Sequence, residues 1–183
     1  MQDKNFKKLL LFTGLPGVGK STISKLVSKK TGAKIIDIDD FKKKDVDPIL
    51  VKTQIDPPET RWNYYQKALE HAFGVFSKGV PIVAMDEVFH LNSLRARLEA
   101  LCVKKCQVLW IEVRCSYGII EKRLQSKKRE GHILSTEETL KMHLVFSEIF
   151  EKFSEKRQNH IIVNNENTGD EVFLVESILK KWS

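Results

Sequence analysis

The sequence has few of the residues and segments that mark several common protein classes. It contains only three cysteines, five prolines and nine glycines in 183 residues. Its apolar runs are only a few residues long, too short for a helix that spans a membrane. The first eight residues are polar and lack the hydrophobic region of a secretory signal. We therefore expect a single domain, 1–183, located in the cytoplasm.

The cysteines do not form a zinc-binding pattern. Cys102 and Cys106 are four residues apart, but no second pair accompanies them, and Cys115 leaves the total odd. Neither a disulfide framework nor a zinc centre held by cysteines is therefore expected. We predict free thiols in a reducing compartment.

Basic residues outnumber acidic residues in the sequence. Thirty-one lysines and arginines against 24 acidic residues give a formal net charge of +7. Such an excess indicates an anionic ligand, and a bound polyphosphate could account for part of it. A nucleic-acid partner is also possible, although no RRM, KH or zinc-finger signature supports one.

One stretch matches a specific motif. Residues 14–21 read GLPGVGKS and fit G-x-x-x-x-G-K-[ST], the P-loop or Walker A pattern. An apolar run at 9–12 precedes it, and a helical pattern follows. Glycines let the backbone N–H groups converge on phosphate oxygens, and the helix adds the positive end of its dipole. We therefore predict a nucleotide site formed by Gly14, Leu15, Pro16, Gly17, Val18, Gly19, Lys20, Ser21 and Thr22.

Two residues of the motif have separate roles in this prediction. Lys20 can reach the β- and γ-phosphates of a bound triphosphate, and the Ser21 hydroxyl can ligate Mg²⁺. The alternative is an ordinary glycine-rich turn before a helix. The strand and helix patterns on either side favour the nucleotide site.

Strands and helices are predicted to alternate along the chain. The pattern indicates strands at 9–13, 34–39, 80–86, 107–113 and 160–163, with the principal later helices at 59–78, 93–103, 117–128, 135–153 and from 168 onward. This alternation predicts a three-layer α/β fold with a parallel sheet. Ligands then bind at the carboxyl ends of the strands.

Acidic residues follow two of these strands. We take Asp39 as the last residue of the second strand and as the base that activates an acceptor hydroxyl, with Asp40 beside it. Asp86 ends the third strand and can hold Mg²⁺ or orient a substrate. Acids at strand ends are also common as solvated or capping residues. Glu87 leaves a further alternative, because it could polarise a water molecule for simple hydrolysis.

Basic residues cluster on and after the fourth helix. We predict a lid around 123–135, in which Arg123 closes over the transferred phosphoryl group and Lys127 and Arg129 assist. The alternative is a solvated helix end that complements the helix dipole. Arg95 and Arg97 could contact an anionic acceptor. The run 42–44 of three lysines is expected to form a solvated edge.

Four segments in order resemble the small P-loop kinases. These are GLPGVGKST, IIDIDDFKK, IVAMDEVF and VRCSYGIIEKRLQSKKREG. The family includes gluconate kinase, chloramphenicol phosphotransferase, the zeta-toxin kinases and the AAA_33-type predicted kinases. The resemblance implies a five-stranded parallel sheet in the order 2-3-1-4-5 and a lid after strand four. It also places Asp39 as the base, Arg123 as a lid arginine, Lys127 where arginine is usual, and adenine near Asn164 and Asn165.

The combined expectation is an ATP- and Mg²⁺-dependent phosphotransferase that acts on a hydroxyl of a small molecule. Two alternatives stay open. The net positive charge is compatible with a kinase that acts on the ends of nucleic acids. A nucleotide-switched protein without a transfer reaction would use the same P-loop.

Overall fold

The computed structural model describes residues 7–45, 55–126, 134–167 and 171–182. Its strands are β1 (Lys8–Thr13), β2 (Lys34–Asp37), β3 (Ile82–Asp86), β4 (Gln107–Arg114) and β5 (His160–Asn164). Its helices are α1 (Lys20–Thr31), α2 (Asp39–Asp45), α4 (Pro58–Ser77), α5 (Asn92–Cys102), α6 (Tyr117–Ser126), α7 (Thr136–Ile149) and α8 (Glu171–Trp182). None of the described helices is long and apolar enough to cross a membrane.

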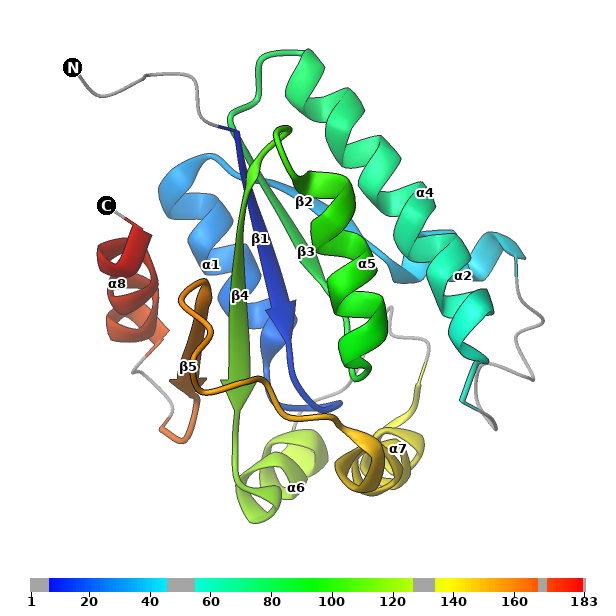
Figure 1. Ribbon diagram of the computed structural model, residues 1–183. Coiled ribbons are helices and arrows are strands. Elements are labelled where there is room, and N and C mark those ends of the chain that lie inside the picture. Colours follow the sequence, from blue (N-terminus) through cyan, green and yellow to red (C-terminus); the bar gives the residue numbers. More distant parts are fainter. Residues whose placement is uncertain (1–6, 46–54, 127–133, 168–170, 183) are drawn as a thin grey trace.

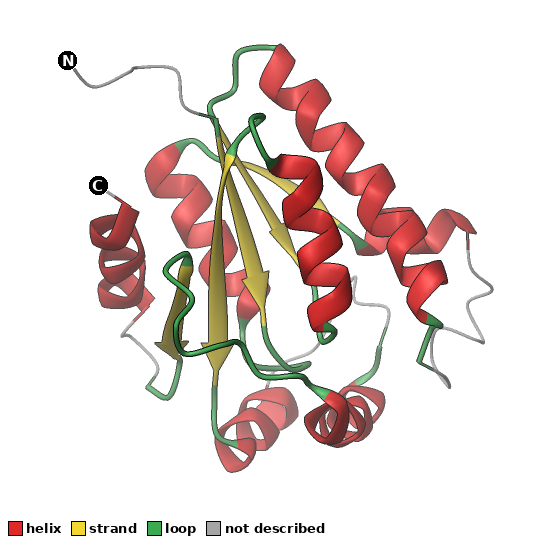
Figure 2. Cartoon of the chain, viewed as in Figure 1, coloured by secondary structure: helices red, strands yellow, loops and turns green. Residues whose placement is uncertain are grey.

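The five strands form one parallel sheet in the order β2-β3-β1-β4-β5, which confirms the expected order. Helices α1 and α8 cover one face of the sheet, and α4 and α5 cover the other (Figures 1 and 2). Helices α6 and α7 lie below the carboxyl ends of the strands (Figure 1). The predicted three-layer α/β fold is therefore confirmed.

The central strand β1 divides the core into two halves. Leu9 and Leu11 pack with residues of α4 and α5, whereas Leu10 and Phe12 pack with residues of α1 and α8. Successive side chains of a strand point to opposite faces, so a strand covered by helices on both sides is apolar throughout. This burial fixes β1 in the middle of the sheet and thereby positions the loop that follows it.

The structure corrects one element boundary that matters for function. Strand β2 ends at Asp37, so Asp39 is the first residue of α2 and not the last residue of the strand. The backbone N–H of Asp39 donates to Asp37 Oδ1 at 2.9 Å, and Ile38 O accepts from the N–H groups of the next turn. Asp37 thus acts as the acidic residue that starts a helix.

Three other expected helix ends differ in outcome. The capping box of Ser135 and Glu138 is present at the start of α7, with both reciprocal hydrogen bonds. The sequence pattern predicted that this helix runs to 153, but α7 ends at Ile149. Helix α1 ends before Gly32, which adopts a left-handed conformation with φ of 72°.

Gly14 offers a test of how tightly the loop after β1 is packed. Its φ is +135°, and a Cβ built on it would lie 2.3 Å from the carbonyl oxygen of Val113 in β4. We expect Gly14→Ala to lower the free energy of unfolding by about 2 kcal/mol or more. Thermal unfolding followed by circular dichroism measures this loss.

Gly74 in α4 provides the matched control. A Cβ there would meet nothing within 4 Å. Gly74→Ala should therefore stabilise the helix by about 0.5–1 kcal/mol. Equal melting temperatures for the two variants would contradict this account of the loop.

Candidate active site

Residues far away in the sequence pack closely against the P-loop. A Cβ on Gly17 would lie 2.7 Å from Ile120 of α6, and one on Gly19 would lie 2.4 Å from Asn165 Nδ2. Both glycines have positive φ, 84° and 96°. Glycine is thus required here for the protein's own packing as well as for the approach of phosphates to the backbone.

Lys20 folds over the loop that precedes it. Its Nζ donates to the carbonyl oxygens of Gly14 and Leu15, each at 3.0 Å. Burial lowers the pKa of Lys20, and the negative charges of Asp86, Glu87 and Asp39 oppose that shift. The same electrostatic neighbourhood therefore contains the P-loop lysine and the predicted acids.

Ser21 and Asp86 meet at the start of α1. The Ser21 hydroxyl donates to Asp86 Oδ2 at 2.5 Å. Burial raises the pKa of Asp86, while the Ser21 hydrogen bond and the Lys20 charge act to lower it. A hydroxyl and a carboxylate are oxygen ligands of the kind that Mg²⁺ takes beside phosphate oxygens. These two side chains fit the predicted Mg²⁺ site.

Asp39 lies at the same end of the sheet, at the start of α2. Its Oδ1 is 3.4 Å from Lys42 Nζ, and its side chain is 44% exposed. Asp40 beside it is exposed. Burial, together with the charge of Asp39, raises the pKa of Asp37 to about 6. The Asp39 carboxylate is therefore partly accessible to solvent and lies beside a cation.

A buried cluster of charged side chains lies beside Asp39. The Glu87 carboxylate accepts from Lys42 Nζ at 2.5 Å and lies 3.6 Å from Arg61 Nη1. It also accepts from the backbone N–H of Val88 at 2.9 Å. Lys42 is only 8% exposed, so the expectation of a solvated edge is wrong for this residue. Lys42 instead joins Glu87 to Asp39.

The opposite charges in this cluster keep each other ionised despite their burial. Burial alone would raise the pKa of Glu87, but Lys42 and Arg61 lower it well below its ordinary value of 4.5. Burial likewise acts to lower the pKa of Lys42, and Glu87 and Asp39 reverse the shift and raise it. Both groups are therefore charged at neutral pH.

We expect Glu87→Gln to destabilise the protein by about 3–5 kcal/mol at pH 7, because it leaves two buried cations without their carboxylate. The depressed pKa of Glu87 contributes stability that is full above about pH 4.5 and is lost as the pH falls toward about 2. The difference between wild type and variant should therefore shrink in that window. Urea unfolding at pH 7 and at pH 3 measures it, and a difference independent of pH would contradict the ion pairing.

Arg123 of α6 contacts the segment that follows β5. Arg123 Nη1 donates to the carbonyl oxygen of Asn165 at 2.8 Å, and its Nη2 donates to that of Glu166 at 3.2 Å. The buried Asn165 side chain donates from Nδ2 to Val18 O at 2.9 Å. Asn164 is exposed at the end of β5. In this structure Arg123 ties α6 to the segment after β5.

His143 is a site neighbour that the sequence did not reveal. It is buried on α7, and its Nδ1 lies 2.8 Å from the carbonyl oxygen of Pro16 in the P-loop. Because a carbonyl only accepts, Nδ1 carries the hydrogen. The face that α7 buries contains Thr139, Met142, His143 and Phe146, and this helical spacing is the one signal that could have indicated it.

The two predicted arginines of α5 have partners of their own. Arg95 is fully buried, donates to the carbonyl oxygens of His90 and Glu151, and has its guanidinium 3.9 Å from the Phe153 ring centre. Arg97 is exposed, pairs with Glu59 at 2.8 Å and lies 4.1 Å over the Trp62 ring. The structure does not bring these two arginines to the P-loop. Lys127 and Arg129 lie outside the described residues.

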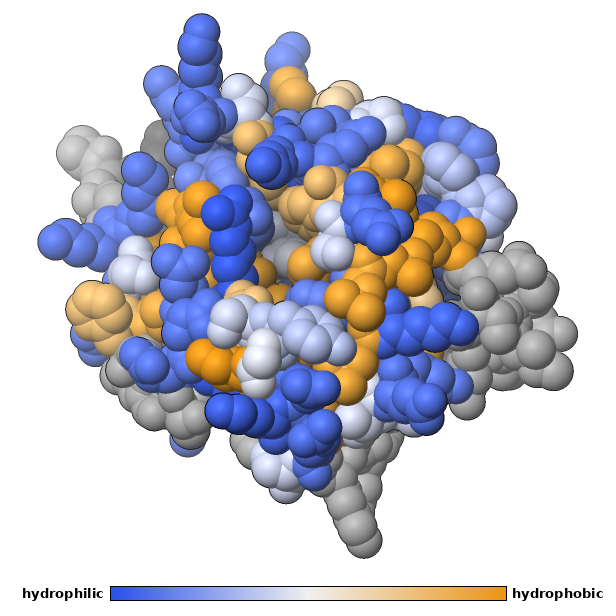
Figure 3. Space-filling model, turned by 90° about the horizontal axis from the view of Figure 1, so that it is seen from below, coloured by the Kyte–Doolittle hydropathy of each residue, from blue (hydrophilic) through white to orange (hydrophobic). Residues whose placement is uncertain are grey.

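Figure 3 shows the molecule from the end at which the strands finish, where hydrophobic residues gather between hydrophilic ones. The P-loop, Asp39 and Asp86 belong to this end, because Asp86 is the last residue of a strand of the parallel sheet and the other two follow strands. A glycine-rich loop that carries Lys20 and Ser21 at the carboxyl end of a strand is typical of P-loop proteins. The strand order β2-β3-β1-β4-β5 is the one that the resemblance to small P-loop kinases implied.

The family follows from a direct comparison. A family model described as an AAA domain, AAA_33, matches residues 9–149. The chain belongs to this family. A search of curated proteins gave no match.

Solved structures share the fold over nearly the whole chain. A sugar kinase from Janibacter sp. HTCC2649 has a TM-score of 0.70 at 19% identity, covering 97% of this chain and 94% of its own. A gluconokinase from Sinorhizobium meliloti 1021 has a TM-score of 0.63 at 14% identity, with coverages of 97% and 93%. The APS kinase of Mycobacterium tuberculosis, solved with AMPPNP and APS, has a TM-score of 0.61 at 15% identity, with coverages of 97% and 98%.

Proposed function

We propose that this protein transfers the γ-phosphoryl group of ATP to a hydroxyl of a small molecule. The observation that carries the proposal is the assembly at one end of the sheet of Lys20, the Ser21–Asp86 pair and the partly exposed Asp39. The similar folds named as sugar kinase, gluconokinase and APS kinase support the same reaction class.

Each group then has a definite task. The backbone N–H groups of the P-loop and Lys20 hold the phosphates and balance their charge. Asp39 orients the acceptor hydroxyl and accepts its proton, with Lys42 fixing the carboxylate. Mg²⁺ held by Ser21 and Asp86 would neutralise charge on the phosphate oxygens. Positioning and charge stabilisation supply most of the rate.

The arrangement favours transfer over simple hydrolysis through Glu87. The Glu87 carboxylate accepts hydrogen bonds from Lys42 and from the Val88 N–H, and it is 7% exposed. A carboxylate held in this way is not free to polarise a water molecule. Asp39 is the more exposed acid and the better placed base.

A screen of acceptors tests the proposal. The protein is incubated with Mg-ATP and separate pools of sugars, nucleosides, antibiotics and 5′-hydroxyl oligonucleotides, and products are read by mass spectrometry. We expect ADP together with one phosphorylated small molecule. Phosphorylation of the oligonucleotide alone would replace the proposal by an end kinase. ADP and free phosphate at equal rates in every pool would replace it by an ATPase.

A further inference from the structure

A second chemically distinctive place lies at the opposite end of the sheet from the P-loop. Here α5 ends and the chain turns into β4 (Figure 1). Cys102 is the last residue of α5, and Cys106 is the residue before β4. Neither thiol has a part in the proposed phosphoryl transfer.

The turn brings the two cysteines together. The N–H groups of Lys105 and Cys106 both donate to Cys102 O, at 2.9 and 3.1 Å. The bond from the Cys106 N–H to Cys102 O closes an α-turn, which holds its end Cα atoms roughly 6 Å apart. A disulfide needs about 4.4–6.8 Å. Lys104 has a φ of 63°, a left-handed conformation that is uncommon for a residue other than glycine.

The two thiols differ in accessibility and in acidity. Cys102 is 1% exposed, whereas Cys106 is half-buried. A hydrogen bond between the side chains lowers the pKa of Cys106, and the charges of Lys105 and Lys7 lower it further, while burial opposes both. The same hydrogen bond and burial raise the pKa of Cys102. Cys106 is the more accessible thiol of the pair, so a dissolved disulfide meets it first.

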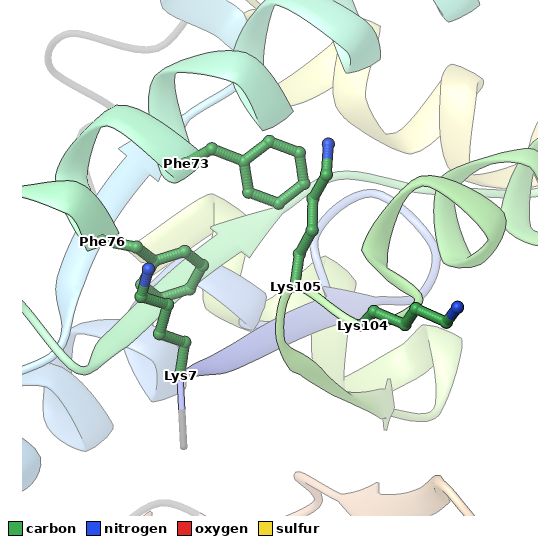
Figure 4. Close-up of a pocket in the computed structure, with 5 residues that line it drawn as sticks. All are labelled: Lys7, Phe73, Phe76, Lys104 and Lys105. Carbon is green, nitrogen blue, oxygen red and sulfur yellow. The ribbon is translucent and has the colours of Figure 1, made fainter. Parts of the chain in front are cut away.

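A pocket of about 300 Å³ lies beside this turn. Figure 4 shows Lys105 of the turn extending beside Phe73 of α4, and Lys7, which precedes β1, beside Phe76; Lys104 completes the lining. The Lys105 ammonium lies 4.4 Å from the Phe73 ring centre. Two cations, Lys7 and Lys105, beside two aromatic rings suit an organic anion, and Lys104 adds a third positive charge at the edge of the pocket.

We propose that Cys106 and Cys102 form a reversible dithiol site that reacts with an anionic low-molecular-weight disulfide held by the lysines of this pocket. The Cys106 thiolate attacks one sulfur of the small disulfide and releases one small thiolate. Cys102 then attacks Cys106 Sγ, and its proton passes to the second small thiolate as that leaves. Two protein thiols are oxidised to one protein disulfide, and one small disulfide is reduced to two thiols.

Glutathione disulfide is the probe for the first test. The intact protein is treated with it, unreacted thiols are alkylated, and peptides are mapped by mass spectrometry. We expect a Cys102–Cys106 disulfide, with Cys115 still free for alkylation. Cys115 is the internal control, because burial raises its pKa. Reaction of Cys115 as fast as Cys106, or no closure of the pair, would overturn the proposal.

Variants separate the roles of the residues. Cys102→Ser should stop at a stable mixed disulfide on Cys106, and Cys106→Ser should leave Cys102 unreacted. The double change Lys7→Gln and Lys105→Gln should slow the reaction with glutathione disulfide by about 3–10-fold more than that with the neutral 2-hydroxyethyl disulfide. Equal slowing with both probes would contradict the proposed binding of the anionic disulfide by these lysines. Peptide mapping of the wild type decides the cysteine pairing without any variant.

Discussion

Replacing Lys20 with alanine is expected to reduce ATP turnover by about 10²–10³-fold or more, because it removes the cation that balances charge on the transferred phosphoryl group. The side chain now donates to two carbonyl oxygens of the P-loop and lies among Asp86, Glu87 and Asp39. Affinity for Mg-ATP should fall at least about tenfold. Isothermal titration calorimetry measures the affinity, and ADP release measures the turnover.

Lys25 supplies the matched control on the same helix. It is exposed on α1, so Lys25→Ala removes one positive charge without touching the P-loop. Its turnover should remain close to that of the wild type. If Lys20→Ala retained both affinity and turnover, the P-loop would not be the nucleotide site.

Asp39→Asn is expected to lower phosphoryl transfer by about 10²–10⁴-fold while ATP still binds, because the amide cannot accept the acceptor's proton. The change keeps the shape of a side chain that lies 3.4 Å from Lys42. Rates with the acceptor found in the screen, together with calorimetric ATP binding, measure the two effects separately.

The Asp39 variant also separates the alternative functions. A protein that only switches with nucleotide should tolerate it, whereas a phosphotransferase should not. Glu70→Gln is a suitable control, since Glu70 is an exposed carboxylate on α4 that accepts from Gln66. Transfer at the wild-type rate in Asp39→Asn would exclude Asp39 as the base.

The framework of the fold could be predicted because its signals are local. Apolar runs such as 9–12 mark strands covered on both faces, and the P-loop motif fixes the connection that follows. The strand order came from the resemblance to small P-loop kinases, and the structure confirms it. The capping box at Ser135 and the stop at Gly32 are also present as expected.

The supports of the site could not be predicted, because they join residues far apart in the sequence. His143 lies 127 residues from Pro16, and Asn165 lies 147 residues from Val18, yet each pair is hydrogen-bonded. Nothing near either residue in the sequence identifies its partner.

Charged residues gave the least reliable local signals. Lys42 stands in a run of lysines, a pattern that is usually solvated. It is nevertheless buried, because its ammonium pairs with Glu87 and with Asp39 of the same helix. Arg95 lies on the same buried face of α5 as Leu94 and Leu98, and that spacing was a signal for burial. Its partners, the Glu151 carbonyl and the Phe153 ring, come from the segment after α7.

A crystal structure with Mg²⁺ and a non-hydrolysable ATP analogue tests the central claim most directly. We predict the β- and γ-phosphates in the P-loop beside Lys20, the metal between Ser21 and Asp86, and the Asp39 carboxylate facing the γ-phosphate across room for a hydroxyl. An empty loop, or an Asp39 side chain turned away from the γ-phosphate, would contradict the account.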